Sequence, residues 1–377
     1  PASNFEENEV PPLPELKSEK IVIYVFIGIN SAWSDKWGAY VESLYDIENA
    51  KIVPIALDKY AYKVSDKVQS YNFIREYELT VCKEQQLFIS MAHEIYRYGF
   101  NEKKEIISTN SALKIFLSHA KEGKNGLNIA KRLKELIDNS NMRRFFDSND
   151  IAPGYRFDDE IINNIKESSV IIINSDIYSS RYWCQREIQT AKEYERPIIE
   201  VDLIDKAMDR KFPFAGNVPV VRADIIDGKV EMDDLYRILE NIMIETIRFN
   251  YADMKLESLK LEMSGRVKKM CRPPEMIDMS KLIKKGEDIV VNYDKIIYPD
   301  PPIYSEEIEF FRKLDIEIYT PIEYEKDKLR GKKVGISISD PAIYELKSSG
   351  QNISHLLRLS QYIANYVLSR GATLIWG

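Results

Sequence analysis

The sequence predicts an α/β protein of several domains, built on parallel sheets with helices on both faces. With 377 residues, the chain is longer than one hydrophobic core usually supports. Short apolar runs typical of buried strands alternate with stretches whose apolar residues recur every three or four positions, as on one face of a helix. Alternation of this kind favours a parallel sheet covered on both sides.

The first unit is predicted over residues 1–105 and begins with an acidic lead-in that contains prolines. The apolar run at 21–27 predicts a buried strand, and residues 37–44 have the pattern of a helix. A second strand is expected at 52–57, and residues 71–100 are helical in pattern. We expect a small α/β unit.

The second unit, residues 110–205, has the clearest alternation. Strands are expected at 113–117, 143–146, 170–173 and 197–201, and helices at 127–137, 157–165 and 183–194. Its order of elements is that of a parallel sheet crossed by helices.

The remainder divides into a helical extension and connector at 206–330 and a last segment at 331–377. The connector has a helical stretch at 235–264 and is then interrupted by prolines. Residues 331–377 have a strand, helix, strand pattern that begins a Rossmann-like domain. One such unit does not complete a sheet, so we expect the chain to stop inside this domain.

Composition excludes several classes of function. The net charge of −7 leaves no basic footprint for nucleic-acid binding. Three cysteines and three histidines are scattered without ligand spacing, so no metal site is expected. No signal peptide and no apolar run of membrane-spanning length occur, which predicts a cytoplasmic protein without membrane contact.

Three blocks in the 110–205 unit have the order and spacing of a known family. They are LKIFLSHA (113–120), RRFFDSNDIAPGYRFDDEI (143–161) and SSVIIINSDIYSSRYWCQREIQTA (168–191), followed by RPIIEV (196–201). Together they resemble the TIR domain, and the resemblance implies a flavodoxin-like parallel sheet. Fold alone does not decide function.

TIR domains include scaffolds that self-associate and enzymes that cleave the nicotinamide–ribose bond of NAD. The enzymes carry a glutamate four residues after a tryptophan, and here Glu187 follows Trp183 at that spacing. On a helix, this step places both side chains on one face. The resemblance implies that Glu187 is catalytic, that NAD is the substrate and that no cofactor is needed. The alternative for Glu187 is an ordinary glutamate on a surface helix.

A single carboxylate suffices for this chemistry. Ordinary glycosidases need a second carboxyl group to protonate the leaving oxygen. Nicotinamide leaves NAD as a neutral molecule, so no general acid is required. A carboxylate can stabilise the oxocarbenium-like ribose that remains.

Further site residues come from the same blocks. Ser118 and His119 lie at the carboxyl end of the first strand, where open α/β sheets bind ligands. The residues expected to contact substrate are Trp183, Ser118, His119, Phe146 and Asp147, and those expected in a loop that stacks TIR domains are Asp150, Pro153 and Gly154. Trp183 can instead be a packing residue, His119 an ordinary loop residue, and the loop a polar cap for the next helix.

The first unit resembles the second. Residues 21–43 parallel residues 170–190, with Trp37 in the place of Trp183, and KIVPIAL (51–57) parallels RPIIEV. The position of Glu187 is then taken by Val41. The first unit is interpreted as a degenerate TIR-like segment without the catalytic residue, or else as an unrelated α/β packing module.

Residues 332–377 resemble the start of a SLOG domain, a Rossmann-like module that senses nucleotide-derived ligands in bacterial conflict systems. Ser337 and Ser339 on the strand and His355 on the helix are the candidate contacts to a regulatory nucleotide, although His355 can equally be an ordinary helix residue. The combination implies an antiphage defence protein in which ligand binding drives TIR self-association and NAD loss. A non-enzymatic scaffold and a cyclase that makes a cyclic ADP-ribose signal stay open as alternatives.

Overall fold

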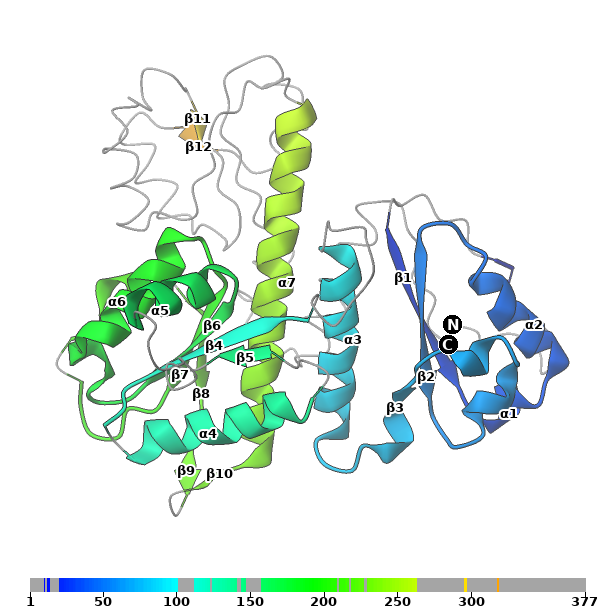
Figure 1. Ribbon diagram of the computed structural model, residues 1–377, viewed down its shortest axis with the longest axis horizontal. Coiled ribbons are helices and arrows are strands. Elements are labelled where there is room, and N and C mark those ends of the chain that lie inside the picture. Colours follow the sequence, from blue (N-terminus) through cyan, green and yellow to red (C-terminus); the bar gives the residue numbers. More distant parts are fainter. Residues whose placement is uncertain are drawn as a thin grey trace.

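In a computed structural model of the protein, the structure describes most of residues 20–262 (Figure 1). The described ranges are 20–100, 112–122, 124–140, 144–146, 157–208, 210–216, 218–226 and 229–262, with residue 10, residues 12–13 and two short strands farther along. Those two strands, β11 (Lys295–Ile296) and β12 (Glu317–Ile318), pair in parallel. Residues 331–377 lie outside the described part, and the predicted Rossmann-like domain with them.

The N-terminal unit, residues 20–100, is a parallel sheet of three strands in the order β1-β2-β3. Its elements are β1 (Ile21–Ile27), α1 (Ile29–Ala32), α2 (Asp35–Leu44), β2 (Ala50–Ala56), β3 (Ile74–Arg75) and α3 (Lys83–Gly99), with short 3-10 turns at Ala61–Val64, Val68–Ser70 and Glu76–Glu78. Ser34 begins α2 by accepting a hydrogen bond from the Trp37 backbone N–H.

The two faces of β1 pack against different helices. Ile27 lies in a cluster with Ala32 of α1 and Val41 of α2. Tyr24, on the opposite face, donates its hydroxyl to the Met91 carbonyl of α3 at 2.5 Å. This alternation is what a strand covered on both sides requires.

The predicted helix at 71–100 is wrong over its first part. Residues 74–78 form β3 and a 3-10 turn, and α3 begins only at Lys83. Cys82, directly before the helix, has a left-handed backbone conformation with φ of 47°. That conformation interrupts the helix, and apolar spacing alone does not reveal it.

The central unit, residues 112–262, contains a sheet of five parallel strands in the order β5-β4-β6-β7-β8. In chain order the elements are β4 (Lys114–His119), α4 (Lys124–Asp138), β5 (Arg144–Phe146), α5 (Phe157–Lys166), β6 (Ser169–Asn174), α6 (Tyr182–Glu193), β7 (Ile198–Asp202), β8 (Val220–Arg222), a hairpin of β9 (Ile225–Ile226) and β10 (Lys229–Val230), and α7 (Met232–Glu262), with 3-10 turns at Tyr178–Ser180 and Pro213–Ala215. The predicted α/β fold with parallel sheets is confirmed.

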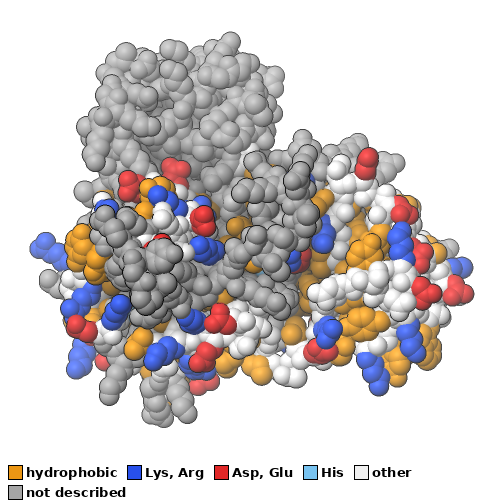
Figure 2. Space-filling view, viewed as in Figure 1, with side chains coloured by type: hydrophobic (Ala, Val, Ile, Leu, Met, Phe, Trp, Pro, Cys, Tyr) orange, Lys and Arg blue, Asp and Glu red, His pale blue; other side chains and the backbone are white. Residues whose placement is uncertain are grey.

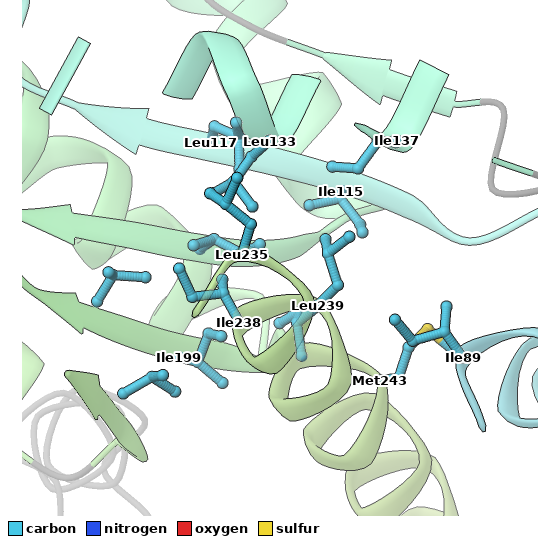
Figure 3. Packing of buried hydrophobic residues seen from close by; sticks show 14 of the residues in the cluster. Ile89, Ile115, Leu117, Leu133, Ile137, Ile199, Leu235, Ile238, Leu239 and Met243 are labelled. Atoms are coloured by element: carbon cyan, nitrogen blue, oxygen red, sulfur yellow. The ribbon is translucent and has the colours of Figure 1, made fainter. Parts of the chain in front are cut away.

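Helices cover both faces of the five-stranded sheet. On one face, α5 and α6 pack over Phe116, Ile172 and Ile198. On the other face, α4 and α7 pack over the alternate residues of the same strands, and α3 of the N-terminal unit joins them. Figure 3 shows Leu235, Ile238 and Leu239 of α7 facing these strands, with Met243 of α7 next to Ile89 of α3. Fully burying each such side chain contributes about 1.5–3 kcal/mol.

The sheet continues past residue 205, where the sequence alternation ends. Strand β8 has only three residues, and Val220 is 54% exposed. A strand this short and this exposed leaves no buried apolar run that the sequence could reveal. Helix α7 then returns across β6, β7 and β8. The last parallel strand of the central unit and its longest helix therefore lie in residues 206–330, the stretch that was predicted to be a helical extension and connector.

A buried histidine joins the two units. His93 of α3 is 1% exposed, and its Nε2 atom accepts a hydrogen bond from the Leu113 backbone N–H at 3.1 Å, just before β4. Burial lowers the pKa of His93 to about 4, with a further contribution from the charge of Arg97. The hydrogen bond from Leu113 requires a neutral imidazole, because a protonated ring has no acceptor nitrogen.

Folding stability is expected to fall by about 3 kcal/mol through His93 as the pH is lowered from about 6.5 to about 4. The pKa of His93 is lower in the folded chain than in the unfolded chain. Between these two values the unfolded chain binds a proton at His93 and the folded chain does not, so lowering the pH favours unfolding. Urea unfolding across this pH range, compared between wild type and His93→Gln, measures the effect. An equally steep loss in the variant would show that His93 is not its source.

Among the residues that the structure describes, no helix is long and apolar enough to cross a membrane.

Candidate active site

Polar side chains gather at the carboxyl ends of β4, β6 and β7, on the face covered by α6. Ser118 of β4 and Glu200 of β7 both pair with Ile172 of β6, so they lie at one level of the sheet with a strand between them. Both alternate with residues of the α4 and α7 face, and they therefore point toward α6. Open α/β sheets bind ligands at this edge.

Glu187 reaches this row from α6. The residue is 6% exposed, and the Ser118 hydroxyl donates to its Oε2 atom at 2.5 Å. Ser118 also shares a hydrogen bond with the hydroxyl of Tyr178, which is itself buried. Burying a carboxylate costs free energy, and this one is held at the sheet edge by a serine hydroxyl, so it is a candidate for a functional role.

Two described neighbours of Glu187, Tyr178 and Cys184, remain uncharged at neutral pH. Burial raises the pKa of Tyr178 well above its usual value, and the charges of Glu187 and Glu200 act in the same direction. Burial also raises the pKa of Cys184 to about 12, again with a contribution from Glu187. At neutral pH, neither the phenol nor the thiol competes as an anion with the carboxylate.

A second buried carboxylate is neutralised by a lysine. Glu200 is 3% exposed, accepts a hydrogen bond from the Asn174 amide at 2.9 Å, and pairs with Lys211 Nζ at 2.8 Å. Lys211 lies in the segment that follows β7. The pair therefore ties this segment down onto the sheet beside the site.

Backbone hydrogen bonds fasten the same segment to the loop after β6. Asp176 accepts from the backbone N–H groups of Asp205 at 2.8 Å and Lys206 at 3.2 Å. Ser179 accepts from the backbone N–H of Phe212 at 3.3 Å. Since Tyr178 lies between the two acceptors, its position is fixed from both sides.

Aromatic side chains form the exposed rim. Tyr182 and Trp183, at the start of α6, are 68% and 38% exposed and pack edge to face with centroids 5.4 Å apart. Arg181 pairs with Glu122 of the loop after β4. Trp183 thus lies one helical turn from Glu187 but faces solvent, whereas Glu187 faces inward.

Comparison with known proteins identifies the central unit. Residues 115–236 match the family model described as TIR domain. This part of the chain is a TIR domain. The match runs past β8 into α7, in agreement with the extent of the sheet. None of the curated proteins matches the chain.

One solved structure, described as that of a candidate phosphosugar isomerase from Bacillus subtilis, shares 13% sequence identity and covers 76% of this chain and 94% of its own. Its TM-score of 0.23 is too low to carry an argument about fold or function.

The TIR domain brings some of the predicted site residues together and separates others. Ser118, Glu187 and the α6 turn that carries Trp183 share one face of the sheet. His119 is buried, but strand alternation directs it to the opposite face from Ser118. The backbone of Phe146 pairs with Phe116 at the end of β5. The predicted Asp147, Asp150, Pro153 and Gly154, and likewise Ser337, Ser339 and His355, lie outside the described residues.

Four site residues are absent from the sequence prediction: Tyr178, Asn174, Glu200 and Lys211. Glu200 had a visible signal, because a charged residue interrupts the apolar run of a central strand. Tyr178 had none, since its role depends on a turn that folds its ring back under α6. Lys211 is far from any motif and is recognised only by its contact.

The N-terminal unit has the same order of elements as the second half of the TIR domain. Strands β1, β2 and β3 followed by α3 correspond to β6, β7 and β8 followed by α7. Val41, predicted opposite Glu187, is 2% exposed and lies on the inner face of α2 with Gly38 and Leu44. An apolar residue fills the position, so this unit has no buried carboxylate there.

Neither a metal nor a polyanion is suggested by the described part of the chain. It contains no group of three or more His, Cys, Asp or Glu side chains placed to hold a metal ion. Figure 2 shows acidic and basic side chains interspersed over the described surface of one face, without a broad region of one sign.

Proposed function

We propose that the TIR domain hydrolyses NAD at its nicotinamide–ribose bond, with Glu187 as the catalytic residue. The observation that carries the proposal is the Glu187 carboxylate itself, buried on α6 at the carboxyl edge of the sheet and held by Ser118. TIR domains include NAD-cleaving enzymes, and Trp183 lies one turn before Glu187 as in those enzymes.

The main requirement of the reaction is the negative charge of Glu187. The bond between ribose C1′ and the pyridine nitrogen breaks, its electron pair stays with nicotinamide, and the ribose becomes an oxocarbenium-like cation. Glu187 stabilises that cation in surroundings of low dielectric constant, where a fixed charge acts strongly. Water then adds at C1′ and releases a proton, which gives ADP-ribose and nicotinamide.

The burial of Glu187 favours a regulated enzyme. A side chain that is 6% exposed cannot meet a ribose unless α6 or its neighbours shift. Self-association of TIR domains supplies a means of opening the site, and exposed Trp183 is placed to stack on a ring once it opens. The same burial also suits the second candidate, a scaffold that only assembles.

The regulatory setting is proposed from sequence resemblance. A nucleotide bound by residues 331–377, through Ser337, Ser339 and His355, would promote assembly of TIR domains and NAD loss in antiphage defence. This part of the proposal concerns residues outside the described structure.

The test is nicotinamide release from NAD by the full chain, alone and with added cyclic nucleotides, with the products separated. Nicotinamide with ADP-ribose supports hydrolysis, and nicotinamide with cyclic ADP-ribose identifies the cyclase instead. No release from folded, assembled protein would favour the scaffold.

A further inference from the structure

A chain of two hydroxyl groups ends on the carboxylate of Glu187. Ser118 donates its only hydroxyl hydrogen to Glu187 Oε2 at 2.5 Å. Ser118 also contacts the hydroxyl of Tyr178. Because the serine hydrogen is already used, the hydrogen between Ser118 and Tyr178 must come from Tyr178. The direction of the chain is therefore fixed from the phenol to the serine to the carboxylate.

Tyr178 is held as the donor at the far end. Its side chain is 1% exposed, and burial raises its pKa well above the usual value, so it retains its hydrogen at neutral pH. The bonds from Asp176 and Ser179 to the segment after β7 fix the turn that carries it. Such a donor chain polarises along its length and favours the ionised form of the acceptor.

We infer that Ser118 and Tyr178 are positioning residues for Glu187, which hold its carboxylate in one orientation and keep it ionised. The expected effect on catalysis rests on the proposed function. The expected effect on the Glu187 carboxylate rests only on the two hydrogen bonds. Neither residue is catalytic itself, because both act through Glu187. Tyr178 in particular is 1% exposed and contacts Ser118, whereas Trp183 at the rim is 38% exposed.

Among the described residues, several other titratable groups near the two hydroxyls have partners or orientations of their own. On α6, Cys184 stays a neutral thiol, and Arg181 begins the helix and pairs with Glu122. On β7, Glu200 is neutralised by Lys211. His119 of β4 points to the other face of the sheet.

Loss of the serine hydroxyl is expected to shift the titration of Glu187. In Ser118→Ala, the midpoint of the carboxylate titration should rise by about one pH unit or more, and kcat should fall about tenfold to a hundredfold with KM little changed. Tyr178→Phe should shift both in the same direction by a smaller amount. Ser118→Thr keeps a hydroxyl and should stay close to wild type.

The experiment is a pH titration of the full chain labelled with 13C at glutamate side-chain carboxyls, with the Glu187 signal assigned through Glu187→Gln. Nicotinamide release is measured on the same samples across the same pH range. Ser169→Ala is the matched control, since it removes a buried hydroxyl pair with Thr246 at 2.7 Å on the opposite face of the sheet. It should leave the Glu187 titration unchanged.

The two proposals fail separately. An unchanged Glu187 titration in folded Ser118→Ala and Tyr178→Phe overturns the positioning role, whatever the activity. A shifted titration in protein that releases no nicotinamide supports the hydroxyl chain and overturns NAD hydrolysis. A rate loss in Ser118→Thr as large as in Ser118→Ala would show that shape and not the hydroxyl matters, and would overturn the inference.

Discussion

Glu187→Gln is expected to lower nicotinamide release by the full chain at least about a hundredfold. Glutamine has the shape of glutamate, and its carbonyl oxygen can still accept the hydrogen bond from Ser118. What it lacks is the negative charge that stabilises the ribosyl cation. The loss should therefore appear in kcat, while KM changes little, because the charge matters most in the transition state.

The matched control is Glu193→Gln on the same helix. Glu193 is exposed at the end of α6, six residues after Glu187. This variant makes the same chemical change and should keep wild-type activity. Glu193→Gln should unfold at the temperature of the wild type. Glu187→Gln should unfold at that temperature or slightly above, because it removes a buried charge. Wild-type activity in folded Glu187→Gln would exclude Glu187 as the catalytic residue.

The fold was predictable because buried parallel strands leave a strong mark in the sequence. Each apolar run of the TIR domain that predicted a strand has both ends within two residues of those of β4, β5, β6 or β7. The exceptions are elements without periodicity. Strand β8 is short and half exposed, β3 has two residues, and the start of α3 is set by the backbone of Cys82. Their positions depend on tertiary contacts, which local patterns do not contain.

The site was predictable only where a family motif or a strand end marks it. Glu187 and Ser118 belong to blocks that resemble the TIR domain, and the structure places them in contact. The resemblance carries no information about the hydroxyl of Tyr178 beneath them or the ion pair of Glu200 with Lys211. Those contacts join residues far apart in the chain, so they follow from the packing of loops on the sheet.

The ion pair beside the site leads to the second large expected effect. Lys211→Met should lower the free energy of unfolding by about 2–4 kcal/mol, because it leaves the buried Glu200 carboxylate without its cation. The lower end of this range allows for the lysine, whose side chain is 35% exposed, and for the amide of Asn174, which remains as a donor. Lys206→Met, an exposed change in the same segment, should alter stability by less than about 0.5 kcal/mol.

A double variant that removes both charges distinguishes an ion-pair effect between Glu200 and Lys211 from a simple loss of side-chain packing. Glu200→Gln keeps an acceptor for Asn174 and removes the charge, so the double variant with Lys211→Met should return to within about 1 kcal/mol of wild type. Urea unfolding of the wild type, both single variants and the double variant measures the coupling between the two positions. Strict additivity of the single effects would mean that Lys211 stabilises the segment through its aliphatic stem and not through Glu200. Because the same segment is bonded to the turn that carries Tyr178, a coupled pair also predicts that Lys211→Met reduces nicotinamide release while the double variant restores it.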